Sequence, residues 1–214
     1  MTRAKVALTA VAVLSVGCAV YRGGELGVVP EYAAAPVPVP QPSISVVLAV
    51  RILVNDRVQD LKREVFPNLE RPVVKAYEDS GYFERVVAGL EPSDLRAEVR
   101  VTEGFLSRPS AVQFSGLTLL LLPHFREVEI SSRTTFVDAA GRPLGTIEKA
   151  ETVHYFNQLF AIAIGRLSGQ YRTEDKTYAD LQRATVVEAA QRGWLQVGDP
   201  AKRTGPGSVS FRSP

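Results

Sequence analysis

The two histidines and a nearby glutamate are the residues whose types and spacing come closest to a metal site. His124 and His154 lie in two segments of alternating polar and apolar residues that flank a turn at Gly141. If these segments pair as a hairpin about that turn, His154 faces Glu127, and His124 lies a few residues away on the first strand. Two imidazoles and a carboxylate can hold zinc, although zinc usually has three or four protein ligands. The same residues fit ordinary cross-strand polar pairs, and we favour that interpretation.

A serine nucleophile is a second chemical reading of the sequence. Ser115 and Ser168 each precede a glycine, and Asp94 or Asp138 could orient His124 in a triad. A triad is defined by its geometry, and a chain of this size offers many such trios by composition alone. The sequence contains no Gly-rich phosphate loop, Gly-x-Ser-x-Gly elbow, His-Glu-x-x-His pair or EF-hand loop. We therefore expect no catalytic residue, no resident metal and no cofactor.

The third reactive side chain is the only cysteine, Cys18, which follows a short apolar run. Residues 1–5 carry two positive charges and no acid, residues 6–16 are mostly apolar, and Gly17 precedes the cysteine. A charged start, an apolar run of about 11 residues and a small residue before the cleavage point are typical of a secretory signal peptide. The run is shorter than the roughly 20 residues of a transmembrane helix. We expect residues 1–17 to be a signal peptide that is removed.

The five residues Leu-Ser-Val-Gly-Cys at positions 14–18 resemble the lipobox of bacterial envelope lipoproteins. In that family the cysteine receives acyl chains, palmitate among them, and becomes the mature N-terminus. The resemblance implies that Cys18 is the lipidation site, and two acyl chains are enough for stable anchoring. Ala19 in the next position implies sorting to the outer membrane, on its periplasmic face. The alternative is an ordinary secretory signal cut nearby, which would leave a free thiol.

Composition narrows the classes of partner and chemistry. If Cys18 is acylated, no thiol remains for a disulfide, a thiolate zinc site, an iron–sulfur cluster or a cysteine nucleophile. The chain has 25 Lys and Arg against 23 Asp and Glu and no basic block, which disfavours nucleic acid as a partner. The expected partners are the membrane, through the N-terminal lipid, and an envelope protein. The sequence leaves the oligomeric state open.

Proline content and hydropathy divide the remaining chain into three parts. Residues 18–42 predict a lipidated N-terminus followed by a Pro-rich tether, and a Pro-rich recognition ligand is the alternative for the same residues. Residues 43–195 predict a single periplasmic domain of the α+β class, with a mainly antiparallel sheet of about five strands and two packing helices. Residues 196–214 have little to bury and predict a flexible tail.

Alternation of apolar residues locates the strands of this domain. Residues 43–55 are apolar at nearly every position and predict a central strand that is covered on both faces. Residues 94–103 alternate cleanly and predict a strand with one polar face, and residues 82–89 predict a short strand. The hairpin about Gly141 would also place Arg133 opposite Glu148.

Helical spacing and cap residues locate the two helices. After Pro67, Asn68 could cap a helix whose apolar residues are spaced four apart, at Leu69, Val73 and Tyr77. Residues 173–195 predict the second helix, capped by a threonine, Thr173 or Thr177. Its apolar stripe comprises Leu181, Ala184, Val187, Ala190 and Trp194.

The order of these elements has a fold-level likeness to known envelope proteins. A strand, a helix, Gly-Tyr-Phe-Glu-Arg-Val at 81–86 and another strand loosely resemble the N-terminal domain of the translocation protein TolB and curli-secretion lipoproteins. The leucine-rich run at 117–122, followed by a long hairpin, resembles small outer-membrane lipoproteins of unassigned function. The resemblance implies an envelope role and no particular reaction.

Two apolar segments, 117–122 and 156–164, are candidates for either core or contact surface. Burial is the default for such runs in soluble domains. In the second segment one helical face could instead contact a partner or a leaflet. That face comprises Phe156, Leu159, Phe160, Ala163 and Ile164.

Three functions follow, in order of preference. The first is a non-enzymatic, lipid-anchored assembly or adaptor component at the outer membrane. The alternative is a carrier of a small apolar ligand or lipid, which would need an enclosed cavity. The third is a metal-dependent hydrolase that uses His124 and His154.

Overall fold

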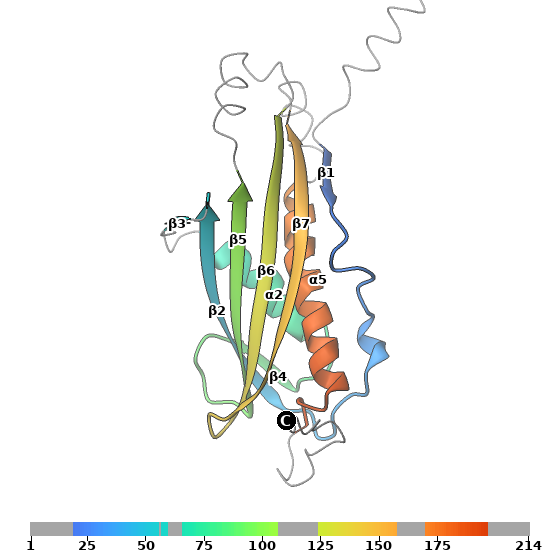
Figure 1. Cartoon of the computed structure of the whole chain (residues 1–214). Helices are drawn as coiled ribbons and strands as arrows, with labels where there is room; N and C mark the ends of the chain where they lie inside the picture. The colour runs from blue at the N-terminus through green and yellow to red at the C-terminus, as the bar shows by residue number, and fades with distance from the viewer. Residues whose placement is uncertain (1–18, 56, 60–65, 107–123, 158–169, 197–214) are drawn as a thin grey trace, which may run out of the picture.

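In the part of the chain that the structure describes, a seven-stranded sheet and two α-helices form the domain (Figure 1). The computed structural model describes residues 19–55, 57–59, 66–106, 124–157 and 170–196. The strands are β1 (Ala19–Arg22), β2 (Ser43–Val54), β3 (Arg57–Gln59), β4 (Arg85–Ala88), β5 (Leu95–Leu106), β6 (His124–Asp138) and β7 (Pro143–Asn157). The helices are the short 3-10 helix η1 (Tyr32–Ala34) and the α-helices α2 (Phe66–Glu78) and α5 (Gln170–Gln191).

The sheet is mixed, with the strand order β1-β7-β6-β5-β2-β3, and β4 pairs with β2. The predicted α+β class is confirmed, but the prediction of about five mainly antiparallel strands is wrong in two respects. The described sheet has seven strands, two more than predicted. The two additional strands, β1 and β3, were not predicted because they are short and lie in stretches without a strand pattern. In addition, β2 runs parallel to β4 and β5, since α2 lies in the crossover that follows β2.

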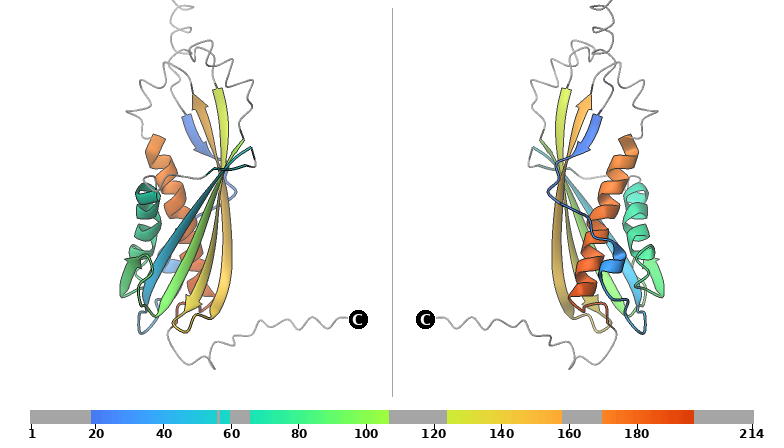
Figure 2. Two further views of the ribbon diagram at one scale, coloured as in Figure 1. Left: turned by 90° about the vertical axis from the view of Figure 1, so that its left-hand side faces the viewer. Right: turned by 90° about the vertical axis from the view of Figure 1, so that its right-hand side faces the viewer.

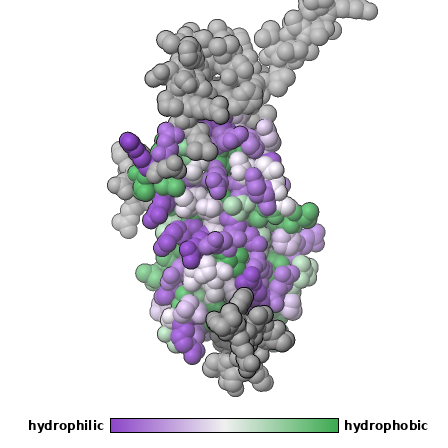
Figure 3. All heavy atoms as spheres, viewed as in Figure 1, coloured by the Kyte–Doolittle hydropathy of each residue, from purple (hydrophilic) through white to green (hydrophobic). Residues whose placement is uncertain are grey.

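Both α-helices cover the same face of the sheet, and the other face is open (Figure 2). Ile44 and Val46 of β2 are fully buried on the helical side, whereas Ala49 on the other side is exposed. The prediction that β2 is covered on both faces is therefore wrong, although its residues are apolar on both. Figure 3 shows hydrophilic residues spread over the open side of the molecule.

The strand faces and the hairpin register agree with the sequence pattern. In β5 the side chains of Leu95, Val99 and Val101 are buried, and those of Glu98 and Arg100 are exposed. This alternation is what residues 94–103 predicted.

The β6–β7 hairpin has the predicted pairing. Glu127 lies opposite His154, and Arg133 lies opposite Glu148. At the turn, Asp138 accepts hydrogen bonds of 2.9 Å from the backbone N–H groups of residues 140 and 142, which fixes the turn and hence the register.

The two helices begin earlier than the sequence predicted. Helix α2 begins at Phe66, not after Asn68, because Pro67 lies in the first turn, where its missing N–H has no helical partner to lose. Helix α5 begins at Gln170, and the Thr177 hydroxyl donates to the Thr173 carbonyl at 2.8 Å inside the helix, so neither threonine is the cap.

The predicted apolar faces of both helices pack against the sheet. Val73 and Tyr77 of α2 and Leu181 and Val187 of α5 are at most 1% exposed. Four residues from the three elements α2, β6 and α5 form a polar network between these layers. They are Tyr77, Ser132, Thr134 and Gln182.

Gln182 is the centre of that network. Its Nε2 donates to Ser132 Oγ at 2.7 Å, and its Oε1 accepts from the Tyr77 hydroxyl at 3.2 Å. Burial raises the pKa of Tyr77, so this hydroxyl remains a neutral donor. The network fixes α2 and α5 relative to β6, because a shift of any partner would leave buried polar groups unpaired.

Candidate functional site

The segment after Cys18 is part of the folded domain. Strand β1 pairs antiparallel with the edge of β7, with Ala19 opposite Phe156 and Arg22 opposite Val153. The Gly23 N–H then donates to the Thr152 carbonyl at 2.7 Å, which continues the pairing beyond the strand. The prediction of a tether at residues 18–42 is therefore wrong for residues 19–42, which the structure describes in full.

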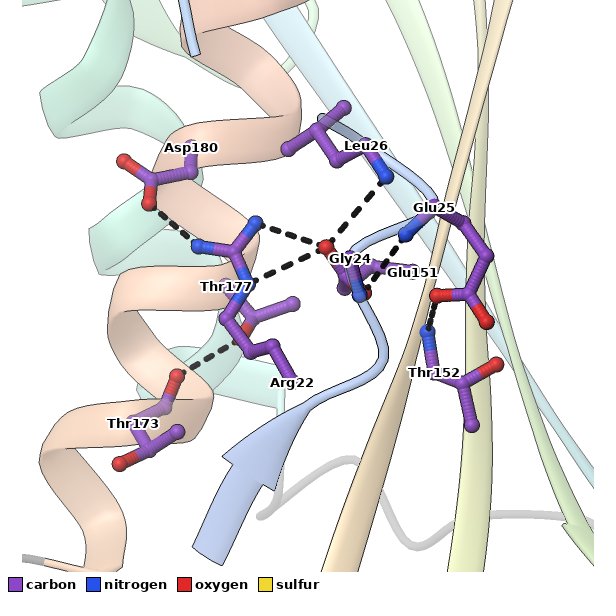
Figure 4. Close-up of polar contacts among 9 residues, drawn as sticks. All are labelled: Arg22, Gly24, Glu25, Leu26, Glu151, Thr152, Thr173, Thr177 and Asp180. Carbon is purple, nitrogen blue, oxygen red and sulfur yellow. Dashed lines mark hydrogen bonds and ion pairs between the residues drawn. The ribbon is translucent and has the colours of Figure 1, made fainter. Parts of the chain in front are cut away.

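Glu151 of β7 is the centre of the contacts that hold this segment (Figure 4). It is 1% exposed, and its carboxylate accepts hydrogen bonds from Arg22 Nε at 3.2 Å and Arg22 Nη2 at 3.0 Å. It also accepts from the backbone N–H groups of Gly24 at 2.7 Å, Glu25 at 3.3 Å and Leu26 at 3.4 Å. A buried carboxylate is costly unless it is paired, and here five donors satisfy it.

Arg22 connects this carboxylate to the helical layer. Its Nη1 lies 2.6 Å from Asp180 Oδ2 of α5, and its Nη2 and Nε bind Glu151 of β7. The guanidinium carries five donors in a planar fork, so one side chain can bind two carboxylates on different elements. Arg22 thus fixes β1 to both the sheet and α5.

The backbone turn after Arg22 makes the arrangement possible. Gly24 has φ +92°, a conformation in which a side chain would be strained, and it lets consecutive N–H groups converge on one carboxylate. The neighbouring Glu25 accepts a 2.8 Å hydrogen bond from the Thr152 N–H. That bond is the main reason why the pKa of Glu25 falls to about 2.

We call this set of contacts the N-terminal clasp. It comprises Arg22, Gly24, Glu25, Leu26, Glu151, Thr152 and Asp180. None of these contacts was predicted from the sequence, because the partners lie more than 120 positions apart in the chain. The sequence feature that could have indicated the clasp is the presence of charged residues, Arg22 and Glu25, and large apolar residues in a stretch that otherwise resembles a spacer.

Residues beyond the clasp continue the attachment. The Tyr32 hydroxyl donates to the Ala76 carbonyl of α2 at 2.6 Å, and the Tyr82 hydroxyl donates to the Tyr32 carbonyl. Ala35 is 6% exposed and belongs to the hydrophobic core. Contacts at several points therefore attach the segment between β1 and β2 to the domain.

The start of β1 defines one end of the sheet, which we call the anchor end. Ala19 lies opposite Phe156 of β7, and Phe156 lies opposite Phe125 of β6. Strand β5 ends and strand β6 begins at this end, since Leu106 pairs with Glu127.

The predicted lipidation site and most of the predicted contact face cannot be placed. Cys18 lies outside the described residues, and so do Leu159, Phe160, Ala163 and Ile164. Phe156 lies in β7, so it does not continue a helical face with them. The contact face stays a prediction.

The residues considered for chemistry are distributed over the sheet. His154 Nδ1 lies 3.4 Å from Glu127 Oε1, and the imidazole stacks on the Tyr21 ring at 4.8 Å, as a cross-strand polar pair would. No group of three metal-binding side chains occurs among the residues that the structure describes. His124 is the first residue of β6 and pairs with Asn157.

The residues that could have formed a triad, His124 with Asp94 or Asp138, lie at opposite ends of the sheet. Asp138 ends the 15-residue strand that His124 begins, so the two are separated by about 45 Å of extended chain. Asp94 precedes Leu95, which pairs with Asp138, and its carboxylate accepts hydrogen bonds from Ser43. Ser115 and Ser168 lie outside the described residues.

A cavity of about 360 Å³ lies at the end of the sheet opposite the anchor end. Ser45, Leu90, Arg96 and Asp138 are among its lining residues, with the hairpin turn beside them. It opens to solvent and has a mixed, mostly polar lining, unlike the enclosed apolar cavity that a lipid carrier would need.

No known protein family and no curated protein sequence matches this chain. Several solved structures are similar to it at low level, and two of them serve as examples. One is a minor lipoprotein from Acinetobacter baumannii, with 10% identity and a TM-score of 0.33, covering 77% of this chain and 100% of that chain. The other is a PelC dodecamer from Paraburkholderia phytofirmans, with 8% identity and a TM-score of 0.30, covering 81% of this chain and 97% of that chain. Similarity at this level assigns this chain to no family.

In the described part of the chain, neither long helix has the length and apolar composition required to span a bilayer.

Proposed function

We propose that this chain is a non-enzymatic lipoprotein of the bacterial outer membrane that holds an assembly or adaptor domain directly against the lipid. The observation that carries the proposal is the position of the clasp. Arg22 is the fourth residue after Cys18, and it is bound to Glu151 and Asp180. An acylated Cys18 would therefore be attached to an ordered strand.

The covalent geometry makes this attachment short. Adjacent Cα atoms are 3.8 Å apart, so acyl chains on Cys18 would begin within one residue of β1. A Pro-rich tether of about 25 residues would let a domain move tens of ångströms away from the bilayer. With the clasp formed, the domain would lie at one defined distance from the bilayer, with one defined end of its sheet next to the membrane.

A fixed height suits an assembly or adaptor role. A domain held in one orientation presents its open sheet face and its hairpin turn to other envelope proteins at a constant position. Such preorganisation lowers the entropic cost of binding a partner, because the orientation is fixed before the encounter.

Membrane fractionation in the native host tests the proposal. The Cys18→Ser variant is expected to move from the membrane fraction to the soluble periplasmic fraction. The Glu151→Gln variant, which weakens the clasp but keeps the cysteine, is expected to stay with the membrane. A Cys18→Ser variant that remains in the outer-membrane fraction would contradict lipid anchoring.

A further inference from the structure

An exposed arginine near the anchor end lies over two aromatic rings. The guanidinium carbon of Arg126 lies 4.3 Å from the centre of the Phe105 ring and 5.6 Å from that of Tyr155. Arg126 is exposed, whereas Tyr155 is 6% exposed, so the rings form a floor beneath the charge. Cation–π contact holds the guanidinium and leaves its charge uncompensated.

Arg126 has no carboxylate partner among the described residues. The described ion pairs of β6 and β7 instead join Arg133 to Glu148, Glu127 to His154, and other side chains along these strands. Its guanidinium carbon lies over aromatic rings, which take up none of its N–H groups in conventional hydrogen bonds, so these donors remain available to a ligand. That edge matches the geometry of a phosphate oxygen pair.

The position of Arg126 points to the membrane as the source of that phosphate. Val20 of β1, Tyr155 of β7 and Arg126 of β6 lie in one row across the sheet. The adjacent row begins with Ala19, the residue that follows Cys18. Arg126 thus lies one row and two strands away from Ala19, the residue that would follow the acylated cysteine.

Other residues at the anchor end have the chemistry of a membrane interface. Tyr21 is 55% exposed and stacks on His154, and Val58 is 58% exposed. Arg57, which precedes Val58 in β3, is also exposed, and β3 pairs with the end of β2 that lies beside Phe105. Tyrosine and arginine are enriched where a protein meets lipid headgroups.

We propose that Arg126 binds the phosphate of a phospholipid headgroup in the leaflet that holds the acyl chains of Cys18. This inference rests on the proposed function, because the acylated cysteine brings the anchor end to that leaflet. Phe105 and Tyr155 preorganise the guanidinium, Arg57 adds a second positive charge, and Tyr21 lies at headgroup level on the other face. The result is a domain that stands end-on at the membrane.

Transfer between vesicles tests the contact in the full acylated protein. Donor vesicles contain phosphatidylethanolamine and phosphatidylglycerol at a ratio of about three to one, and the acceptors contain phosphatidylcholine. Arg126→Gln is expected to leave the donors about fivefold faster than the native protein, the usual effect of one basic residue at an anionic surface. Arg126→Lys keeps the charge without the planar fork and should fall between the two.

Arg85→Gln is the matched control, because this exposed arginine lies in β4 at the end opposite the anchor end. It should transfer at the native rate. Equal rates for Arg126→Gln and the native protein, or an equal acceleration by Arg85→Gln, would overturn the proposal. Loss of an envelope-protein crosslink in Arg126→Gln without a change in transfer would also overturn it, in favour of an acidic protein partner.

A second measurement separates this inference from lipid anchoring. The full chain with Cys18→Ser, with and without Arg126→Gln, is sedimented with the anionic vesicles at low salt. Arg126→Gln should weaken binding to these vesicles about fivefold, as in the transfer experiment. Raised salt should remove the difference between the chains with and without Arg126→Gln. An unchanged bound fraction would reject the phosphate contact, even if mass spectrometry shows that Cys18 is acylated.

Discussion

Arg22 and Glu151 lie 129 positions apart in the sequence and share two hydrogen bonds, of 3.0 and 3.2 Å, at the edge of the sheet. The same arginine reaches Asp180 on α5. These contacts determine where the chain enters the domain, and hence which end of the domain an acylated Cys18 would bring to the membrane.

Glu151→Gln should lower the free energy of unfolding by about 3 kcal/mol, because it removes a charge from a buried and paired site. One amide oxygen cannot satisfy Arg22 and three backbone N–H groups, and the amide nitrogen adds a donor where acceptors are needed. Urea denaturation measures the loss, and limited proteolysis should cut residues 19–35 sooner than the rest. Glu148→Gln, on an exposed rung of the same strand, should change stability by less than about 0.5 kcal/mol. Equal losses in the two variants would contradict the account of the clasp.

Glu25 should make the stability of the protein depend on pH in the acid range. Its pKa is lowered from 4.5 to about 2 in the folded state, so its contribution is fully present above about pH 4.5. Between pH 4.5 and 2 the unfolded chain takes up the proton first, and the contribution is lost as the pH falls. Glu25→Gln should therefore show a shallower decline in this range and converge with the native protein near pH 2. Parallel curves over the whole range would show that the Thr152 hydrogen bond does not hold Glu25.

Gly145→Ala should destabilise the hairpin end of the domain by about 1–3 kcal/mol. A Cβ at position 145 would lie 2.2 Å from two atoms of the Trp194 ring, so the ring or the strand must move. The fluorescence of Trp194, the only tryptophan, follows unfolding at the site itself. Gly104→Ala is the control, because its Cβ would meet Glu129 at an ordinary 3.8 Å. A Gly145→Ala variant as stable as Gly104→Ala would contradict this packing.

The hairpin and the strand faces could be predicted from the sequence because their determinants are local. Asp138 and Gly141 set the turn, the turn sets the register, and the register places His154 opposite Glu127. Likewise, strict alternation from Leu95 onward reports which face of β5 is buried.

The clasp and β1 could not be predicted, because no local sequence pattern indicates them. Arg22 has the partners Glu151 and Asp180 only after the sheet and α5 have assembled. The glycines and prolines of residues 23–42 suit a spacer as well as they suit a packed connection with left-handed turns, such as that at Gly24. Composition cannot separate these two outcomes, since the difference lies in long-range pairing.

The orientation of the acylated protein on a membrane tests the central claim most directly. Trp194 packs against Phe136 and Gly145 near the hairpin turn, about 35 Å along β7 from the row of Ala19 and Phe156. In vesicles with nitroxide-labelled headgroups, the double variant Tyr21→Trp, Trp194→Phe should be strongly quenched, and the native Trp194 should not. Glu151→Gln added to the double variant should reduce the quenching, because the clasp no longer holds the anchor end in place. Equal quenching at the two tryptophan positions would show that the domain is not held end-on, and the account would be wrong.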